Sequence, residues 1–321
     1  MFAYALKRLG ALAVTFIFMT MIVFASIRLI PGSAIDLIIA SADMTAASSE
    51  LTARQQLESA LGLDKPVHTQ YFRWIGGLLT EGDLGRSLWT GAPVTHEVLA
   101  RLPVSIELGG IAIVLSLFIG IPAGAYAAMR QNRPFDHIAR WTAIAVMAKP
   151  TFVLATLVVV LPSIWWGWSP PLVYIPFAEH PLGNLCQTLV PATIMGLGLA
   201  AITLRMTRAT VLDVLREDYV RTARAKGLPE RLIVTRHILR NALIPVITMI
   251  GLEVPLMFGG VVVLEQIFAI PGMGLLLLEA VGRRDYPIVM GIFLIVGTAV
   301  LISNLVTDLA YAFLNPTIRY A

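Results

Sequence analysis

The chain has 321 residues, of which 57% are hydrophobic and 14% are charged, and its mean hydropathy is +0.78. No water-facing surface could hide that apolar excess, so the composition excludes an ordinary soluble enzyme, a disordered chain and a fibrous protein, and predicts a polytopic membrane protein. The single cysteine, Cys186, excludes an internal disulfide framework, and the net charge of +4 fits either basic cytoplasmic loops or a nucleic-acid partner, so the position of the charges must decide.

Six apolar runs are long enough to cross a hydrocarbon core of about 30 Å, which takes about 20 helical residues. They comprise residues 9–27, 104–129, 141–166, 185–204, 242–264 and 286–313. Their length and their lack of strict alternation favour helices over barrel strands. We therefore predict an all-α protein with six transmembrane helices. The first run is too long for the apolar part of a signal peptide, so we interpret it as a retained helix.

The distribution of Lys and Arg predicts the orientation of these helices. With the N-terminus inside, the inner segments hold 15 of the 24 cations, and nine of these lie in residues 205–240. Most outer cations lie in one long loop, where translocation largely ignores charge. Both termini are therefore expected in the cytoplasm. The excess of Lys and Arg is explained by a basic surface on the cytoplasmic side, so no nucleic-acid partner is needed to account for the net charge. We divide the chain into a first helix (1–30), an extracytoplasmic region (31–102) and a five-helix core (103–321).

The extracytoplasmic region is too long for a simple turn and carries two short helical patterns. Pro66 can open the second of them. Its apolar residues recur at helical spacing on one face, and they are Val67, Tyr71, Trp74, Ile75 and Leu78. This face is expected to lie on the outer membrane surface, to pack on the bundle, or to dock another protein.

The most charged part of the chain is the inner segment 205–240, and it predicts a helix, a sharp turn and a second helix. Asp218 to Lys226 has a helical composition, Gly227 can supply a left-handed cap, and Pro229 with Glu230 can begin the second helix. A compact, charged projection of this kind is suited to docking in a cleft of another protein.

Motifs for catalysis are missing from the sequence. No lysine precedes Ser or Thr, so a nucleotide-binding loop of the form G-x-x-x-x-G-K-[ST] is excluded. His96 and Glu97 begin like a zinc-protease motif, but Ala100 occupies the position of the second histidine. No G-x-S-x-G elbow occurs. We therefore expect no enzyme, no cofactor and no metal site, and we interpret the chain as a transporter, channel or receptor.

Several segments in one order resemble the permease subunits of ABC importers of the peptide/nickel subgroup, which includes dipeptide and oligopeptide permeases. They read RLIPG, LGLDKPVHTQYFRWIGGLLTEGDLGRSLWTGAPV, DYVRTARAKGLPERLIVTRHILRNALIPVIT, GGVVVLEQIFAIPGMGLLLLEAVGRRDYPIVMG and LNPTIRY. Together they cover nearly the whole chain and are most similar to the B-type subunit.

The resemblance implies a bacterial or archaeal plasma (inner) membrane protein that works by alternating access. It also implies a homologous second permease chain, two cytoplasmic ATPase subunits that use ATP and Mg, and an extracytoplasmic solute-binding protein. The subgroup handles dipeptides, longer peptides, nickel chelates and related solutes, and no residue of this chain chooses among them.

In that family the charged inner loop, here residues 216–241, couples the permease to the ATPase. Gly227 matches the turn glycine of the family's EAA motif and Ala223 its second alanine, whereas Arg221 stands where the motif has its glutamate. The expected coupling residues are Asp218, Arg221, Ala223, Gly227, Pro229, Glu230, His237, Arg240 and Asn241. The alternative for Arg221, Arg224 and Lys226 is that they only set topology and solvation.

Two charged residues fall inside predicted spans. Glu253 lies near the midplane of the fifth span and Lys149 within the third. An ionised group at that depth costs at least about 2.5–3.5 kcal/mol, so it should face a cavity or a partner. We expect the two residues either to line the translocation path or to form a structural ion pair.

Two further expectations concern packing and the rival class of transporter. Gly120 and Gly124 form a G-x-x-x-G pattern that predicts close helix packing, within the chain or against a partner permease. The alternative function is an autonomous secondary transporter, which would need internal repeats and its own site for a coupling ion.

Overall fold

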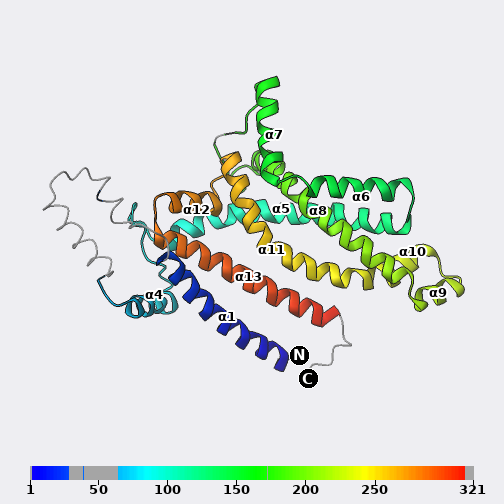
Figure 1. Cartoon of the computed structure of the whole chain (residues 1–321), viewed down its shortest axis with the longest axis horizontal. Coiled ribbons are helices and arrows are strands. Elements are labelled where there is room, and N and C mark those ends of the chain that lie inside the picture. The colour runs from blue at the N-terminus through cyan, green and yellow to red at the C-terminus, as the bar shows by residue number, and fades with distance from the viewer. Residues whose placement is uncertain (1, 29–38, 40–63, 172, 315–321) are drawn as a thin grey trace. The chain divides into compact units, whose positions relative to one another are not determined.

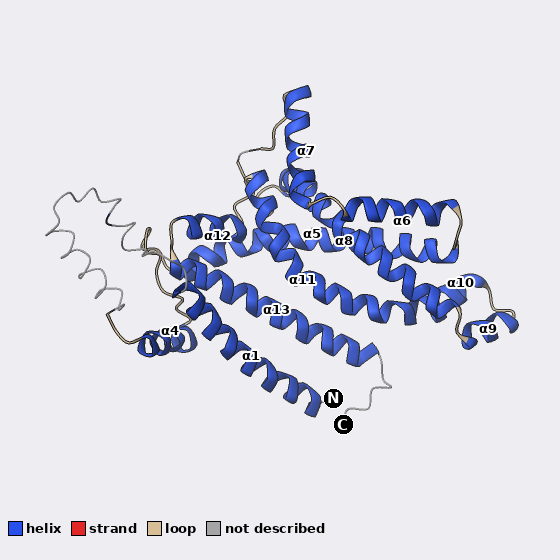
Figure 2. Ribbon diagram, viewed as in Figure 1, coloured by secondary structure: helices blue, strands red, loops and turns tan. Residues whose placement is uncertain are grey.

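The computed structural model describes residues 2–28, 39, 64–171 and 173–314 (Figure 1). These residues are almost entirely helical, and no strand occurs among them (Figure 2). The longer helices are α1 (Phe2–Arg28), α4 (Val67–Glu81), α5 (Val94–Met129), α6 (Pro134–Met147), α7 (Thr151–Trp166), α8 (Pro181–Leu215), α11 (Arg240–Phe268), α12 (Met273–Gly282) and α13 (Tyr286–Leu314). The all-α prediction is confirmed. The first short helix predicted outside the membrane and residues 315–320 lie outside the described residues.

Five stretches of the described residues are long and apolar enough to cross a membrane. They are Arg8–Arg28, Val94–Met129, Pro181–Leu215, Glu230–Pro255 and Tyr286–Ala310. Two bent helix pairs raise the number to seven if each pair is one span. The multi-pass character is therefore confirmed, whereas the count of six and the cytoplasmic location of both termini stay predictions.

The third predicted span, residues 141–166, is not one straight helix. It is divided between α6 and α7, which meet at an angle of 88°. Pro150 causes the break, because proline lacks a backbone N–H and disfavours the helical conformation of the residue before it. Lys149 is that residue, and it is exposed at the bend rather than enclosed in a span.

The two glycines of the G-x-x-x-G pattern lie where α5 packs closely against α8. A Cβ atom on Gly120 would come within 2.7 Å of the Thr203 Cβ, and one on Gly124 within 2.5 Å of the Leu204 carbonyl oxygen. Any larger residue would push the two helices apart. The predicted close packing is confirmed, and it occurs within the chain.

The helices form two compact units. The first comprises Val104–Ile270 and Ile302–Ala321 together with Met1, and the second comprises Phe2–Pro103 and Pro271–Leu301. In the first unit α5, α8 and α11 enclose a common apolar core. Its most buried members include Leu108, Ala112, Ala192, Met195, Leu199, Met257, Val261 and Leu264. The predicted division of the chain at residues 30 and 102 stays a prediction.

Within the second unit, a buried aspartate joins two segments that are far apart in the sequence. Asp285 is 3% exposed, and its carboxylate accepts hydrogen bonds from the Ser87 hydroxyl (2.5 Å) and the Leu88 N–H (3.2 Å). The Trp89 indole N–H donates to the Arg283 carbonyl oxygen at 2.8 Å. These bonds hold the GDLGRSLW turn against the start of α13.

The second of the two short helices predicted for residues 31–102 is present. Pro66 is the N-cap of α4, and Gly82 closes the helix in the left-handed conformation. Tyr71 and Trp74 pack on Phe24 of α1, which belongs to the same unit. Of the three placements expected for the apolar face, packing against the bundle is therefore observed for these two residues.

Candidate functional site

The charged segment after α8 folds into the predicted helix, turn and helix. The helix α9 (Asp218–Ala225) is followed by Lys226 as its C-cap and then by Gly227, whose φ of 73° is the left-handed conformation that glycine adopts without strain. The N–H groups of Gly227 and Leu228 donate to the carbonyl oxygens of Arg224 (2.9 Å) and Ala223 (3.4 Å). The predicted glycine cap is confirmed, and it reverses the chain after two turns of helix.

The second helix begins with Pro229 as its N-cap, as the sequence predicts, but its hydrogen bonding changes along its length. A short α10 (Glu230–Leu232) continues as a π-helix, η1 (Ile233–Leu239), and then as α11. The sequence analysis did not predict the π segment, although its two buried residues, Ile233 and Ile238, are five apart, which matches the i→i+5 bonding of a π-helix. The return segment of the loop is thus continuous with a candidate span.

Buried apolar side chains fasten the loop to the ends of the longer helices. Val220 and Ala223 of α9 and Ile233 and Ile238 of η1 are each at most 7% exposed. They form one cluster with residues from α5, α8 and α11, which are Ala125, Ala128, Val211 and Ala242. The second alanine of the EAA-type motif is therefore a packing residue here. A force applied to the loop would reach three long helices through this cluster.

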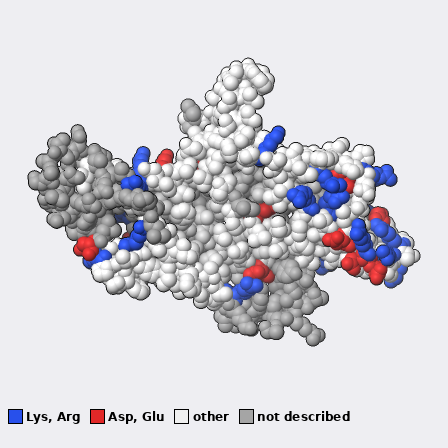
Figure 3. Space-filling view, viewed as in Figure 1, with Lys and Arg blue, Asp and Glu red and all other residues white. Residues whose placement is uncertain are grey.

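The other face of the loop is polar and exposed. Arg224 and Glu230 pair across the turn at 2.7 Å, and Arg221 pairs with Asp218 at 3.5 Å. The Arg224 guanidinium lowers the pKa of the Glu230 carboxyl, and Glu230 raises that of Arg224. Figure 3 shows positive and negative side chains gathered at the end of the molecule that carries α9 and α10. Such ion pairs contribute little stability, so this face remains available to a partner.

The structure brings all nine predicted coupling residues together in this loop and the first turn of α11. Asp218, Arg221, Gly227, Pro229, Glu230, Arg240 and Asn241 are exposed, His237 is half-buried and Ala223 is buried. The Asn241 side-chain amide donates to the Tyr219 hydroxyl at 3.0 Å and to the His237 carbonyl oxygen at 2.9 Å. This contact ties the start of α11 to α9.

A buried salt bridge that the sequence did not predict braces the same end of the first unit. Asp136 is fully buried, and Arg208 binds its two carboxylate oxygens at 2.5 and 2.8 Å. The Asn132 N–H donates to the same carboxylate at 2.9 Å. The pair joins the start of α6 to the C-terminal part of α8. Its only sequence signal is that each residue lies beside an apolar run.

Glu253 and Lys149 do not meet in the structure. Glu253 is 1% exposed, and its Oε1 accepts a hydrogen bond from Thr203 (3.1 Å), whose hydroxyl contacts that of Ser116 (2.9 Å). Its Oε2 has no hydrogen-bond partner among the described residues. Lys149 lies exposed at the bend before α7, and no salt bridge joins it to Glu253. The expected ion pair is therefore absent from this part of the chain.

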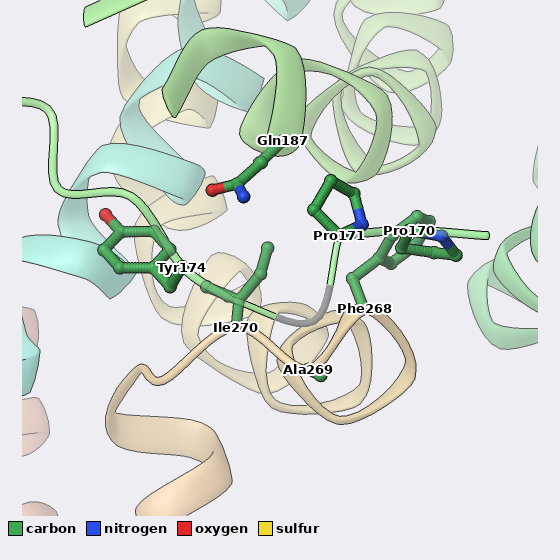
Figure 4. A pocket seen from close by; sticks show the side chains of 7 residues that line it. All are labelled: Pro170, Pro171, Tyr174, Gln187, Phe268, Ala269 and Ile270. Carbon is green, nitrogen blue, oxygen red and sulfur yellow. The ribbon is translucent and has the colours of Figure 1, made fainter. Parts of the chain in front are cut away.

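A small pocket lies where the loop before α8 approaches the end of α11 (Figure 4). It encloses about 10 Å³, which is room for about one water molecule. Its lining consists of Pro170, Pro171, Tyr174, Gln187, Phe268, Ala269 and Ile270. Burial, and then the Glu107 carboxylate, raise the pKa of Tyr174 to about 12, so the phenol stays neutral. A solute of several atoms does not fit.

Comparison with known families gives the loop and the helices a context. The family "Binding-protein-dependent transport system inner membrane component" matches residues 120–320, and its N-terminal counterpart matches residues 1–109. The chain belongs to this family. It is a permease subunit of an ABC importer, a multi-pass protein of the bacterial inner membrane. Such importers work with a partner permease, an ATPase and a binding protein.

Curated relatives match this permease along its full length. It is 37% identical to the dipeptide transport system permease protein DppB of Escherichia coli K12, with 100% of this chain and 99% of that protein covered. It is 36% identical to the di/tripeptide permease DppB of Pseudomonas aeruginosa, with the same coverage. A putative peptide transport permease of Brucella abortus is 38% identical, with both chains fully covered. The relatives are transport subunits, and a binding-protein-dependent permease is not an autonomous secondary transporter.

Proposed function

We propose that this permease pairs with a second, homologous permease chain to form a path for dipeptides or other short peptides. The observation that carries the proposal is the full-length identity of 36–38% to permeases named for dipeptide, di/tripeptide and peptide transport. Full coverage means that the segments around the path, and not only the loop, resemble those of peptide permeases. Other solutes handled by similar importers are the alternatives that the experiment below excludes.

In the proposed cycle the energy comes from two ATPase subunits, which bind ATP and Mg, and this chain supplies the contact that receives it. ATPase closure would press on the loop 216–241, and the apolar cluster beneath the loop would pass the movement to α5, α8 and α11. Alternating exposure of the path to the two sides of the membrane follows from that movement. The packed cluster supports this step, because tightly packed interiors transmit displacement.

Uptake by the reconstituted importer tests the proposal directly. Proteoliposomes containing this chain, its partner permease and the ATPases should accumulate a labelled dipeptide only when binding protein and internal ATP are both present. Vesicles with this chain alone should accumulate none, because its sequence lacks the G-x-x-x-x-G-K-[ST] loop and ATP would have to act through the ATPase subunits. Uptake by the lone chain, or a complete complex that hydrolyses ATP in response to loaded binding protein yet rejects every peptide, contradicts the assignment.

We also propose that Glu253 serves the path, since its Oε2 has no partner among the described residues and a buried carboxylate is costly to keep. Glu253→Gln should lower peptide uptake about tenfold or more, because a hydrogen bond to a charged group contributes about 1.5–3 kcal/mol. Thr203→Val is the control, since it removes the neighbouring hydroxyl and keeps the charge. Lys149→Met tests the other predicted residue in the same assay. Unchanged uptake by a correctly assembled Glu253→Gln complex removes Glu253 from the path.

A further inference from the structure

The helix α4 lies across the C-terminal end of α1, and both belong to the second unit (Figures 1 and 2). Three residues of α1, at successive turns of that helix, contact α4. The Thr20 hydroxyl contacts the Tyr71 hydroxyl at 2.9 Å, and the Phe24 ring lies 5.4 Å from the Tyr71 ring. Arg28 donates a hydrogen bond to the Gln70 side chain. Thr20, Phe24 and Arg28 are spaced by four residues, so they form one line along α1.

These contacts set the depth of α4 in the membrane. The apolar stretch Arg8–Arg28 has 21 residues, which at 1.5 Å per residue span about 31 Å, close to the hydrocarbon thickness. Arg28 therefore marks one boundary of the core, the outer one in the predicted topology, and Thr20 lies about 12 Å deeper. A helix that touches both residues lies at the level of the interface between headgroups and acyl chains.

The same contacts show which side of α4 faces the membrane interior. Gln70 meets the boundary residue Arg28, whereas Tyr71 meets the deeper Thr20, so turning from Gln70 to Tyr71 moves inward. Successive residues of a helix are rotated by about 100° about its axis. Leu79 and Phe72 therefore lie roughly 80° and 100° beyond Tyr71 in the same direction. Turning the other way leads to Arg73 and Thr80. The inward side of α4 therefore carries Ile75, Leu79 and Phe72 together with one polar residue, His68, whereas the outward side is polar.

Two large apolar side chains on the inward side are mostly uncovered by the described residues. Phe72 is 66% exposed and Leu79 is 72% exposed, and no residue of α4 is fully buried although much of the helix is apolar. A solute-binding protein would approach from the aqueous side and would meet the opposite face. Lipid is the occupant that the depth and the direction of these side chains select. Arg73 on the outward side and Lys65 just before the helix would then lie near lipid phosphates.

We propose that α4 is an interfacial helix that inserts Phe72 and Leu79 into the outer leaflet of the bilayer. Aromatic residues at this depth suit the arrangement, since Tyr71 and Trp74 sit where such side chains form membrane belts. The helix fixes the outer end of α1 at one depth in the bilayer. The inference concerns the membrane surface, and it holds whichever solute is transported.

Spin-label accessibility in the complete importer tests this placement. The single cysteine, Cys186, is exposed, so it is first replaced by serine. Nitroxide labels are then attached to Phe72→Cys, Leu79→Cys, Arg73→Cys and Thr80→Cys, one at a time, in complexes reconstituted in phosphatidylethanolamine and phosphatidylglycerol vesicles. Labels at 72 and 79 should collide with oxygen and lose collisions with an aqueous nickel chelate, at depths of about 5–10 Å. Labels at 73 and 80 should collide freely with the chelate.

Each other pattern overturns the proposal. Free collision of the chelate with the labels at 72 and 79 would place α4 in water. Exclusion of both oxygen and chelate would mean that protein covers the face. Protection that appears only when binding protein is added would assign the face to that partner. The labels at positions 72 and 79 are measured in separate variants. If one variant misfolds, the other still tests the placement of α4.

Discussion

Replacing Gly227 with valine is expected to weaken the retention of the ATPase subunits and to lower ATP-driven uptake about tenfold. Gly227 adopts a φ of 73°, which costs an L-residue roughly 1–2 kcal/mol and a β-branched one more. A cost of that size lowers the equilibrium constant for forming the turn, and with it the affinity of a contact that requires the turn, by about tenfold. The readouts are the ATPase retained when this chain is purified by an affinity tag, and uptake in proteoliposomes.

Gly167 provides a matched control for this substitution. It closes α7 with a φ of 65°, it is exposed, and an added Cβ meets no atom within 4 Å, as at Gly227. Gly167→Val therefore imposes the same backbone strain away from the loop. We expect its complexes to retain the ATPase. Equal loss of ATPase in the two variants would show that strain disturbs the fold in general, and full retention in Gly227→Val would remove the turn from the coupling contact.

Replacing Arg208 with methionine is expected to destabilise the permease by about 3–5 kcal/mol, because it leaves a buried carboxylate without its counter-charge. Asp136 is fully buried and makes two bonds to Arg208, whereas the exposed Asp218 and Arg221 pair at 3.5 Å. The measurement is the thermal unfolding temperature of the purified complex in detergent. Arg221→Met, which breaks only the exposed pair, should leave that temperature nearly unchanged.

A double variant separates the salt bridge from simple loss of packing. In Asp136→Leu with Arg208→Met no buried charge remains, so the double variant should recover much of the stability that Arg208→Met loses. If Arg208→Met unfolds at the wild-type temperature, the pair does not brace α6 against α8. If the double variant is as unstable as the single one, packing of the arginine side chain is the cause.

Sequence patterns predicted the local features of the loop because those features depend on neighbouring residues. Pro229 and Gly227 act on the backbone at their own positions, so the helix start and the reversed turn could be anticipated. The break at Lys149 has an equally local cause in Pro150, yet the continuous apolar run concealed it. Hydropathy records only how apolar a stretch is and does not register a missing backbone N–H.

Partners distant in the chain could not be predicted in this way. Asp136 and Arg208 are 72 residues apart, and Glu253 meets Thr203 from 50 residues away. Nothing in the spacing of either pair indicates contact, because contact depends on which faces of α6, α8 and α11 pack together. The same reasoning applies to Lys149 and Glu253, whose sequence positions could not show that they form no salt bridge.

Composition and charge were sufficient to establish a multi-pass helical membrane protein, because transfer free energies depend on residue type and little on neighbours in space. The order of its motifs was sufficient to indicate the permease family. Folding into three dimensions was needed to place α4 at the membrane boundary, to bury Asp136 with Arg208 and to join the loop to three long helices. These features arise from side chains that packing brings together. The order of residues along the chain does not show how close two distant side chains lie in the folded structure.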